Sequence, residues 1–236
     1  MLNILIPAAG AGRRFVEAGY KESKPFIDVL GKPMLQRVID NVRPAEAHRF
    51  HIILRRDAVP PSVMGFYDSH MLLTDGVTEG AACTALLAKG YLDNDSPLII
   101  ANSDQLLDWN VDDFLVAAEG SEGSIVTFTA SDPKWSYVQT SQSGSVVRVV
   151  EKAVISDQAT CGVYYWARGA DFVRCAERMI AKDIRTNGEF YLAPSYNELI
   201  AEGGLVTTYR VPVEVMHGLG TPEDLQAYLA SQSVAV

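Results

Sequence analysis

Two glycines and two arginines follow directly after the first apolar run of the chain, residues 2–6. Residues 8–14 read Ala-Ala-Gly-Ala-Gly-Arg-Arg. Glycines let backbone N–H groups come close to phosphate oxygens, and successive amides form an anion-binding nest. The arginine guanidinium adds a planar fork that matches phosphate geometry. This spacing predicts a phosphate-binding loop, with a plain glycine-rich turn as the alternative.

Two well-known phosphate-binding motifs are absent from this part of the chain. A dinucleotide-binding fingerprint needs a third glycine where Phe15 stands. A P-loop ending at Gly31-Lys32 needs a glycine five residues before Gly31, and that residue is Phe26. The loop must therefore belong to another kind of site.

The composition of the 236-residue chain limits the classes of function. A net charge of -9 argues against a general nucleic-acid binder. The three cysteines form no metal-type pair, which indicates reduced thiols, a cytoplasmic protein and no structural zinc. No apolar run reaches the roughly 18 residues of a membrane span, and the start predicts a strand rather than a signal peptide.

Strands and helices are expected to alternate in the first half of the chain, which predicts a doubly wound parallel α/β sheet. The strands are expected at 2–6, 50–54, 71–73 and 97–101, and the helices at 34–42, 80–92 and 111–118. In the second half we expect strands at 125–130, 146–151, 160–166 and 205–211, and helices at 170–181, 193–202 and 222–230. We expect one domain over 1–236, with a nucleotide-binding half at about 1–122 and an acceptor-binding half at about 123–236.

Further motifs after the loop give the chain a family resemblance. Lys24 is followed by proline, and residues 31–35 read Gly-Lys-Pro-Met-Leu at the start of a predicted helix. With loop 8–14, these motifs resemble the signature of the nucleotidyltransferases that include the sugar-1-phosphate pyrophosphorylases. The resemblance is to a short form without a C-terminal β-helix domain. It implies a Rossmann-like, doubly wound, mainly parallel but mixed sheet flanked by helices, of the nucleotide-diphospho-sugar transferase type.

The resemblance also implies roles for the nucleotide side of the site. Arg14 and Lys24 would be catalytic, contacting the β and γ phosphates and the leaving pyrophosphate. Gly80, at the start of the predicted helix 80–92, would pack against the base, with an ordinary helix start as the alternative. Asn102 would contribute to ribose binding. The remaining nucleotide-binding residues would be those of the loop: Ala8, Ala9, Gly10, Ala11, Gly12 and Arg13.

Asp104 comes just after the predicted strand 97–101, where the family has a carboxylate that binds Mg²⁺. The metal would neutralise charge on the reacting phosphates. The alternative is a carboxylate that caps a turn. Asp93 and Asp95 form an Asp-x-Asp pattern like that of glycosyltransferases, but they precede the strand, which indicates a solvated turn.

The acceptor side is expected around Glu151 and Lys152, which resemble the Glu-Lys pair that meets the sugar phosphate in the family. Lys152 would be catalytic and would hold the acceptor phosphate. Glu151 would contact a hydroxyl or amine, and Gly162 would lie against the sugar. Glu189, in segment 186–191, would belong to another wall. An exposed charged pair at a strand end is the alternative for residues 151–152.

One position departs from the family pattern. Several members carry an Asp, a second metal ligand, two residues before a Gly-Thr pair, and here that position is Gly218. His217 and Glu214 are the nearby substitutes, although histidine is a poor match for Mg²⁺. This departure favours a non-sugar acceptor somewhat.

The leading prediction is a Mg²⁺-dependent nucleotidyltransferase that moves a nucleoside monophosphate from an NTP to a sugar 1-phosphate, releasing pyrophosphate. No serine or cysteine stands in a nucleophile context, which favours direct displacement. The alternatives are a cytidylyltransferase for a small non-sugar phosphorylated acceptor, a glycosyltransferase that uses a nucleotide sugar, and an inactive nucleotide sensor. The expected partners are the NTP and the acceptor, without nucleic acid or membrane, and a homo-oligomer is compatible with the sequence.

Overall fold

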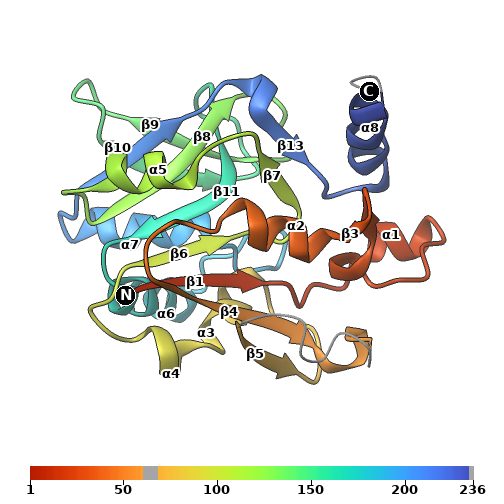
Figure 1. Ribbon diagram of the computed structural model, residues 1–236. Coiled ribbons are helices and arrows are strands. Elements are labelled where there is room, and N and C mark those ends of the chain that lie inside the picture. The colour runs from red at the N-terminus through yellow and green to blue at the C-terminus, as the bar shows by residue number, and fades with distance from the viewer. Residues whose placement is uncertain (61–68, 234–236) are drawn as a thin grey trace.

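The computed structural model describes residues 1–60 and 69–233, and a nine-stranded mixed sheet runs through its centre (Figure 1). Four of its strands are parallel and lie in the order β6-β1-β4-β5. They are β1 (Leu2–Pro7), β4 (His48–Arg55), β5 (Ser69–Thr74) and β6 (Leu98–Ala101). Because β1 pairs with β4 on one side and β6 on the other, the strand order reverses beside β1, as in doubly wound folds.

The second half of the chain extends the sheet with mainly antiparallel strands. β11 pairs antiparallel with β6, β8 and β9, while β10 pairs with β9 and β12 lies parallel to β8. These strands are β8 (Gly123–Thr129), β9 (Ser136–Thr140), β10 (Val146–Glu151), β11 (Gln158–Trp166) and β12 (Val206–Arg210). Two small sheets are formed by β7 (Gln105–Leu107) with β13 (Met216–Gly218) and by β2 (Asp28–Val29) with β3 (Lys32–Pro33).

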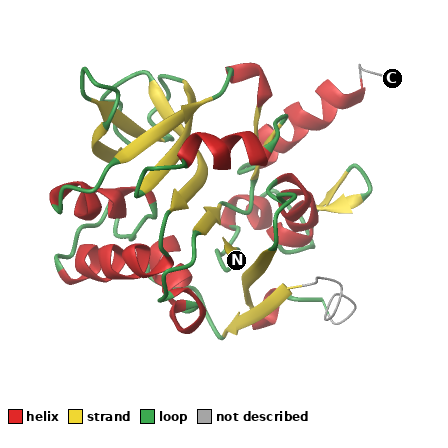
Figure 2. Cartoon of the chain, turned by 60° about the vertical axis from the view of Figure 1, so that its left-hand side comes forward, coloured by secondary structure: helices red, strands yellow, loops and turns green. Residues whose placement is uncertain are grey.

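Helices cover both faces of the sheet (Figures 1 and 2). They are α1 (Arg13–Glu17), α2 (Met34–Asn41), α3 (Ala81–Leu86), α4 (Lys89–Leu92), α5 (Val111–Ala118), α6 (Gly169–Ala181), α7 (Tyr196–Ala201) and α8 (Pro222–Ser233). Short 3₁₀ turns are η1 (Lys24–Phe26), η2 (Arg56–Ala58), η4 (Ala193–Ser195) and η5 (Val213–Val215). Within residues 1–60 and 69–233, every helix is too short or too polar to cross a lipid bilayer.

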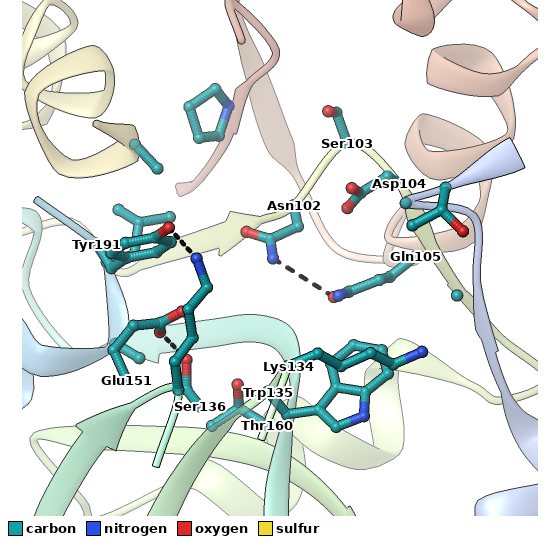
Figure 3. A pocket seen from close by; sticks show the side chains of 18 of the residues that line it. Asn102, Ser103, Asp104, Gln105, Lys134, Trp135, Ser136, Glu151, Thr160 and Tyr191 are labelled. Atoms are coloured by element: carbon teal, nitrogen blue, oxygen red, sulfur yellow. Dashed lines mark hydrogen bonds between the residues drawn. The ribbon is translucent and has the colours of Figure 1, made fainter. Parts of the chain in front are cut away.

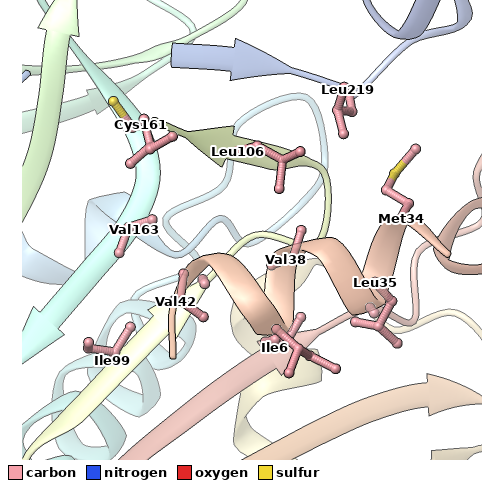
Figure 4. Close-up of a cluster of buried hydrophobic side chains, with 14 of the residues drawn as sticks. Ile6, Met34, Leu35, Val38, Val42, Ile99, Leu106, Cys161, Val163 and Leu219 are labelled. Carbon is pink, nitrogen blue, oxygen red and sulfur yellow. The ribbon is translucent and has the colours of Figure 1, made fainter. Parts of the chain in front are cut away.

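Alternating side chains of the central strands feed two separate cores. Ile4 and Ile6 of β1 point to the core shared with α2, whereas Leu5 belongs to the core shared with α3 and α6. Figure 4 shows Ile6 beside Val38 and Leu35 of α2. Burial on both faces explains why residues 2–6 read as a nearly continuous apolar run.

The predicted helix 80–92 is wrong as one continuous element. The chain forms α3 and α4 with a tighter stretch between them, where Leu87 N–H donates to Thr84 O and Ala88 N–H donates to Ala85 O, both at 3.1 Å. These are i to i−3 hydrogen bonds, which tighten the turn and change the direction of the helix. The alanine-rich composition favoured an uninterrupted helix, but it carries no information on this local change.

A buried histidine links the amino-terminal ends of β1, β4 and β5. His51 is 1% exposed, and its Nε2–H donates to Oδ1 of Asn3 at 3.0 Å. Its ring also lies 5.2 Å from the ring centroid of His70 and 5.2 Å from that of Tyr91. Burial, followed by the charges of His70 and Arg49, lowers the pKa of His51 to about 4.

We predict that His51 makes the fold sensitive to acid between about pH 6.5 and pH 4. A histidine in the unfolded chain binds a proton near pH 6.5, whereas folded His51 stays neutral to about pH 4. The free energy of unfolding is therefore highest above pH 6.5 and decreases by roughly 3 kcal/mol in all as the pH falls to about 4. Denaturant unfolding across this range should show a shallower pH slope in His51→Gln than in the unchanged protein. A His48→Gln control should keep the full slope, and an unchanged slope in His51→Gln would contradict the prediction.

Candidate active site

A cavity of about 590 Å³ opens where β1 and β6 end. The loops after these parallel strands meet at the reversal of strand order, which is the usual ligand site of such sheets. Several of the predicted residues line this cavity: Arg14, Lys24, Asn102, Asp104, Glu151 and Lys152. The fold therefore brings together residues from both halves of the chain.

Lys24 and Asp104 form an ion pair at one side of the cavity. Lys24 begins the 3₁₀ turn η1, and Asp104 follows β6, so the pair joins the segments after two neighbouring strands. Their side chains are 19% and 21% exposed, which leaves both within reach of a ligand. Gly220 lies next to this pair, and a Cβ on it would lie only 3.2 Å from Oδ2 of Asp104. A larger residue at position 220 would therefore crowd the carboxylate.

The loop after β1 divides between the core and a second cavity. Ala8 and Ala9 are 5% and 2% exposed, and Ala8 N–H donates to Ile53 O at 2.8 Å. Residues 10–12 line a neighbouring cavity of about 490 Å³, which shares Lys24 with the first cavity. Arg13 and Arg14 are both exposed, and of the two it is Arg14 that lines the first cavity. The nucleotide-binding roles of residues 8–13 stay predictions.

Gly80 is in close contact with the protein itself. Its φ is +136°, and a Cβ on it would lie 2.3 Å from Phe190 O. Two backbone hydrogen bonds hold the same contact, from Phe190 N–H to Glu79 O at 2.8 Å and from Ala82 N–H to Phe190 O at 3.0 Å. Gly80 therefore allows the Phe190 backbone to pack directly against this turn. The predicted contact of Gly80 with the base stays a prediction.

Gly162 lies beneath two amide side chains of the cavity. It has a φ of +72°, and a Cβ on it would lie 1.8 Å from Oε1 of Gln105 and 2.5 Å from Nδ2 of Asn102. The register of β11 against β8 shifts between Thr160 and Tyr164, so Gly162 lies in a bulge. The side chains of Asn102 and Gln105 fill the space next to Gly162. The contact of Gly162 with an acceptor stays a prediction.

Glu151 of the predicted Glu-Lys pair lies on the opposite side of the cavity from Asp104 (Figure 3), and Lys152 lines the same cavity. Glu151 is 8% exposed and accepts a hydrogen bond from the Ser136 hydroxyl. Burial raises the pKa of Glu151, while the Ser136 hydrogen bond and the Lys152 charge act against that rise. The Lys152 ammonium donates to the Tyr191 hydroxyl. The pair is therefore a partly buried wall, and the alternative of an exposed charged pair is wrong.

Some lining residues were missed by sequence reasoning. Lys134, Trp135 and Ser136 come from the turn before β9 and from its first residue, and this strand was not predicted. Thr221 and Asp224 enter the cavity from the beginning of α8. The aromatic and β-branched residues Tyr137, Val138 and Thr140 were the available signal for the missing strand.

Glu189 is exposed and is not among the residues that line the cavity. Its N–H donates to Thr186 O at 3.0 Å, which closes a tight turn. Two other residues of the same segment, Asn187 and Tyr191, do line the cavity. The segment thus forms the expected wall, while the acceptor role of Glu189 itself stays a prediction.

Gly218 lines the cavity, and neither substitute considered for the departure at this position is available there. His217 Nε2 lies 2.7 Å from Oδ2 of Asp108, and Glu214 is outside the cavity lining. A Cβ on Gly218 would lie 3.5 Å from the Trp135 ring and 4.0 Å from Oδ2 of Asp224. No group of three or more His, Cys, Asp or Glu side chains suited to a metal occurs in the part of the chain that the structure describes.

Asp93 and Asp95 lie in the turn that precedes β6 and do not line the cavity. The side chain of Asn94 stabilises this turn, because its Nδ2 donates to Tyr91 O and its Oδ1 accepts from Ser96 N–H. The structure agrees with the prediction of a turn at this Asp-x-Asp pattern.

Comparison with known families adds an independent observation. The family model described as the MobA-like NTP transferase domain matches residues 4–164. The chain belongs to this family. The prediction of a nucleotidyltransferase family and of its fold class is confirmed.

Several relatives of this MobA-like NTP transferase are known. The bifunctional protein GlmU of Cupriavidus taiwanensis is 26% identical over 242 residues, covering 95% of this chain and 50% of that protein. The chain thus spans about half the length of this curated relative. A nucleoside-diphosphate-sugar pyrophosphorylase structure from Vibrio cholerae RC9 has a TM-score of 0.82 at 25% identity, covering 96% of this chain and 99% of that one. The inositol-1-phosphate CTP transferase of T. maritima shares the fold, with a TM-score of 0.75 at 16% identity over 98% of this chain and 95% of that one.

We predict that Gly162→Ala impairs nucleotidyl transfer more than it impairs folding. The new Cβ would displace the amides of Asn102 and Gln105 inside the cavity, and kcat/KM should fall roughly tenfold or more. Gly144→Ala is the matched control, because Gly144 also has a positive φ, +88°, but has open space around it. Both variants should lose about 1 kcal/mol of stability from backbone strain. Equal activity in the two variants would show that the amides need no fixed position.

Proposed function

We propose that the chain transfers a nucleoside monophosphate from an NTP to a sugar 1-phosphate, with release of pyrophosphate. The observation that carries this proposal is the single cavity that joins Arg14, Lys24 and Asp104 to Glu151 and Lys152. Cationic groups stand on both sides of it, as a reaction between two phosphate compounds requires. The half-length match to GlmU and the likeness to the V. cholerae pyrophosphorylase support the same activity.

The residues around Asp104 fit a magnesium ion. Mg²⁺ prefers oxygen ligands, keeps several waters, and is commonly held by one or two carboxylates together with substrate phosphates. Asp104 and Asp224 supply carboxylates to the cavity lining, and Ser103, the residue before Asp104, adds a hydroxyl. A bound Mg²⁺ would neutralise charge on the reacting phosphates. In this proposal Asp104 is its principal protein ligand.

The chain's own residues would act by positioning and by stabilising charge. An acceptor phosphate oxygen attacks the α-phosphorus, a new P–O bond forms, and the bond to the bridging oxygen of the β-phosphate breaks. Arg14 and Lys24 would stabilise the negative charge that gathers on the departing pyrophosphate. Lys152 would align the acceptor phosphate, which is already ionised and needs no strong general base.

The acceptor wall favours a polyol over a quaternary ammonium compound. The hydroxyl groups of Ser136, Thr160 and Tyr164 line the cavity on the side of the buried carboxylate of Glu151. Ser136 donates to Glu151, and the Thr160 and Tyr164 hydroxyls pair with each other, so their remaining lone pairs can accept from sugar hydroxyls. Quaternary ammonium ligands instead need free aromatic faces.

The aromatic rings of this wall already have cations of the protein beside them. Lys134 Nζ lies 4.9 Å from the Trp135 ring centroid, and Lys152 Nζ lies 4.4 Å from that of Tyr191. Their positive charges would repel a cationic acceptor such as phosphocholine. These two contacts support a sugar phosphate as the acceptor, rather than the non-sugar acceptor that Gly218 favours in the sequence.

We predict that Lys24→Ala and Asp104→Ala each lower kcat/KM for pyrophosphate release roughly 100-fold or more, because each removes a charge next to the reacting phosphates. Matched controls are Lys89→Ala and Asp40→Ala, whose charged partners lie at the surface. The measurement is a coupled pyrophosphate assay with Mg²⁺ across the four NTPs. Near-normal rates in the Lys24 and Asp104 variants would overturn these assignments.

We also predict the order of acceptors in the same assay. Glucose 1-phosphate and other sugar 1-phosphates should support turnover. Inositol 1-phosphate, a polyol phosphate like the one that the T. maritima enzyme is named for, is tested beside them and should also support turnover. Phosphocholine should be at least about 100-fold poorer, because the lysines on the aromatic wall repel its ammonium group. Turnover of phosphocholine in preference to every sugar phosphate would favour the non-sugar alternative.

A further inference from the structure

Lys152 does not project from its strand in the ordinary way. It follows the last residue of β10 and has a φ of +54°, a left-handed conformation that is rare outside glycine. Its N–H donates to Trp135 O at 3.0 Å, which fixes this kink. The kink directs the ammonium away from β10 and toward Tyr191.

Tyr191 contacts the Lys152 ammonium in two ways. Its hydroxyl accepts a hydrogen bond from Nζ, and its ring centroid lies 4.4 Å from the same nitrogen. Both side chains line the cavity and are partly buried. Burial raises the pKa of Tyr191, so the phenol is neutral and acts as a hydrogen-bond acceptor rather than as a counter-charge. The Tyr191 hydroxyl therefore orients the ammonium without adding a negative charge beside it.

The position of Tyr191 is in turn fixed by the turn before α3. The neighbouring residue Phe190 is held there by its two backbone hydrogen bonds to Glu79 and Ala82. Arg185 adds a 2.7 Å ion pair to Glu79 and lies 4.0 Å from the Phe190 ring centroid. Gly80 leaves no room between the two segments, since any Cβ would overlap the Phe190 backbone.

We propose that Tyr191 is a positioning residue that holds the Lys152 ammonium at the acceptor wall. The contact between Phe190 and the turn at Gly80 sets where Tyr191 stands. A segment from the nucleotide-binding half of the chain thereby fixes a cation of the acceptor-binding half. This inference rests on the proposed function only where it assigns the acceptor phosphate to Lys152.

The first test measures the Lys152 amine directly and needs no substrate. The enzyme is acetylated with an N-hydroxysuccinimide ester, and the rate at Lys152 is followed by mass spectrometry against the exposed Lys89. Tyr191→Phe removes the hydroxyl and keeps the ring, so acetylation of Lys152 should become roughly threefold to tenfold faster. Tyr209→Phe, on β12 and outside the cavity lining, is the matched control and should leave the rate unchanged. An unchanged rate in Tyr191→Phe would overturn the positioning role.

Gly80→Ala tests the second half of the inference in the same assay. Its new Cβ must push Phe190 away, so Lys152 acetylation should rise as in Tyr191→Phe. Gly90→Ala, which has open space, is its control. Thermal melting shows whether each variant is folded. A folded Gly80→Ala protein with the unchanged rate would overturn the link through Phe190.

A double-mutant cycle with glucose 1-phosphate as the acceptor separates positioning from a direct role. Tyr191→Phe should raise the acceptor KM roughly threefold to tenfold, with the NTP KM unchanged within about twofold. In a Lys152→Met background the same change should have no further effect, because the ammonium it positions is gone. An equal rise in both backgrounds would show that Tyr191 acts on the acceptor by itself. If Lys152→Met leaves the acceptor KM unchanged while the acetylation result holds, the proposed role of Lys152 fails and the Tyr191–Lys152 contact stands.

Discussion

The pairing of β1 with β4 on one side and β6 on the other is the constraint on which the site depends. Parallel strands end at the same edge of a sheet, so the loop after β1 and the loop after β6 must meet. The ion pair between Lys24 and Asp104 forms at that meeting point although the residues are 80 positions apart. The segments that complete the cavity come from the antiparallel half, which β11 attaches directly to β6.

Glycine serves two different purposes around this cavity. Gly220 keeps the space beside Asp104 open, so that a ligand can approach the carboxylate. Gly80 and Gly162 instead allow protein groups to come close, the Phe190 backbone in one case and two amides in the other. The same residue type therefore indicates close approach in the sequence, but it does not say whether a ligand or the protein approaches.

The charge of the cavity differs from that of the whole chain. The chain carries a net charge of -9, yet the cavity lining has more cationic than acidic side chains: Arg14, Lys24, Lys134 and Lys152 against Asp104, Glu151 and Asp224. Nearby charges of this kind would act on a bound phosphate more strongly than distant surface charges, which water and salt screen. In the proposed reaction, the buried Glu151 and the lysines beside the aromatic rings would add selectivity to this attraction, because they would favour neutral hydroxyls over a second cation.

The sequence by itself determined the family, the alternation of the first half and several residues that line the cavity, such as Lys24, Asp104 and the 151–152 pair. These features depend on local patterns: apolar runs that end in glycine or a carboxylate, and short motifs with fixed spacing. The sequence did not predict β9 or the break between α3 and α4, because short elements have weak local signals that tertiary contacts override. Only the tertiary structure decided which side chains share the cavity: Trp135 and Asp224 enter it from segments without a motif, and Gly80 faces Phe190. The physical reason is that contacts between distant segments depend on how the sheet and helices pack, and local sequence patterns do not specify that packing.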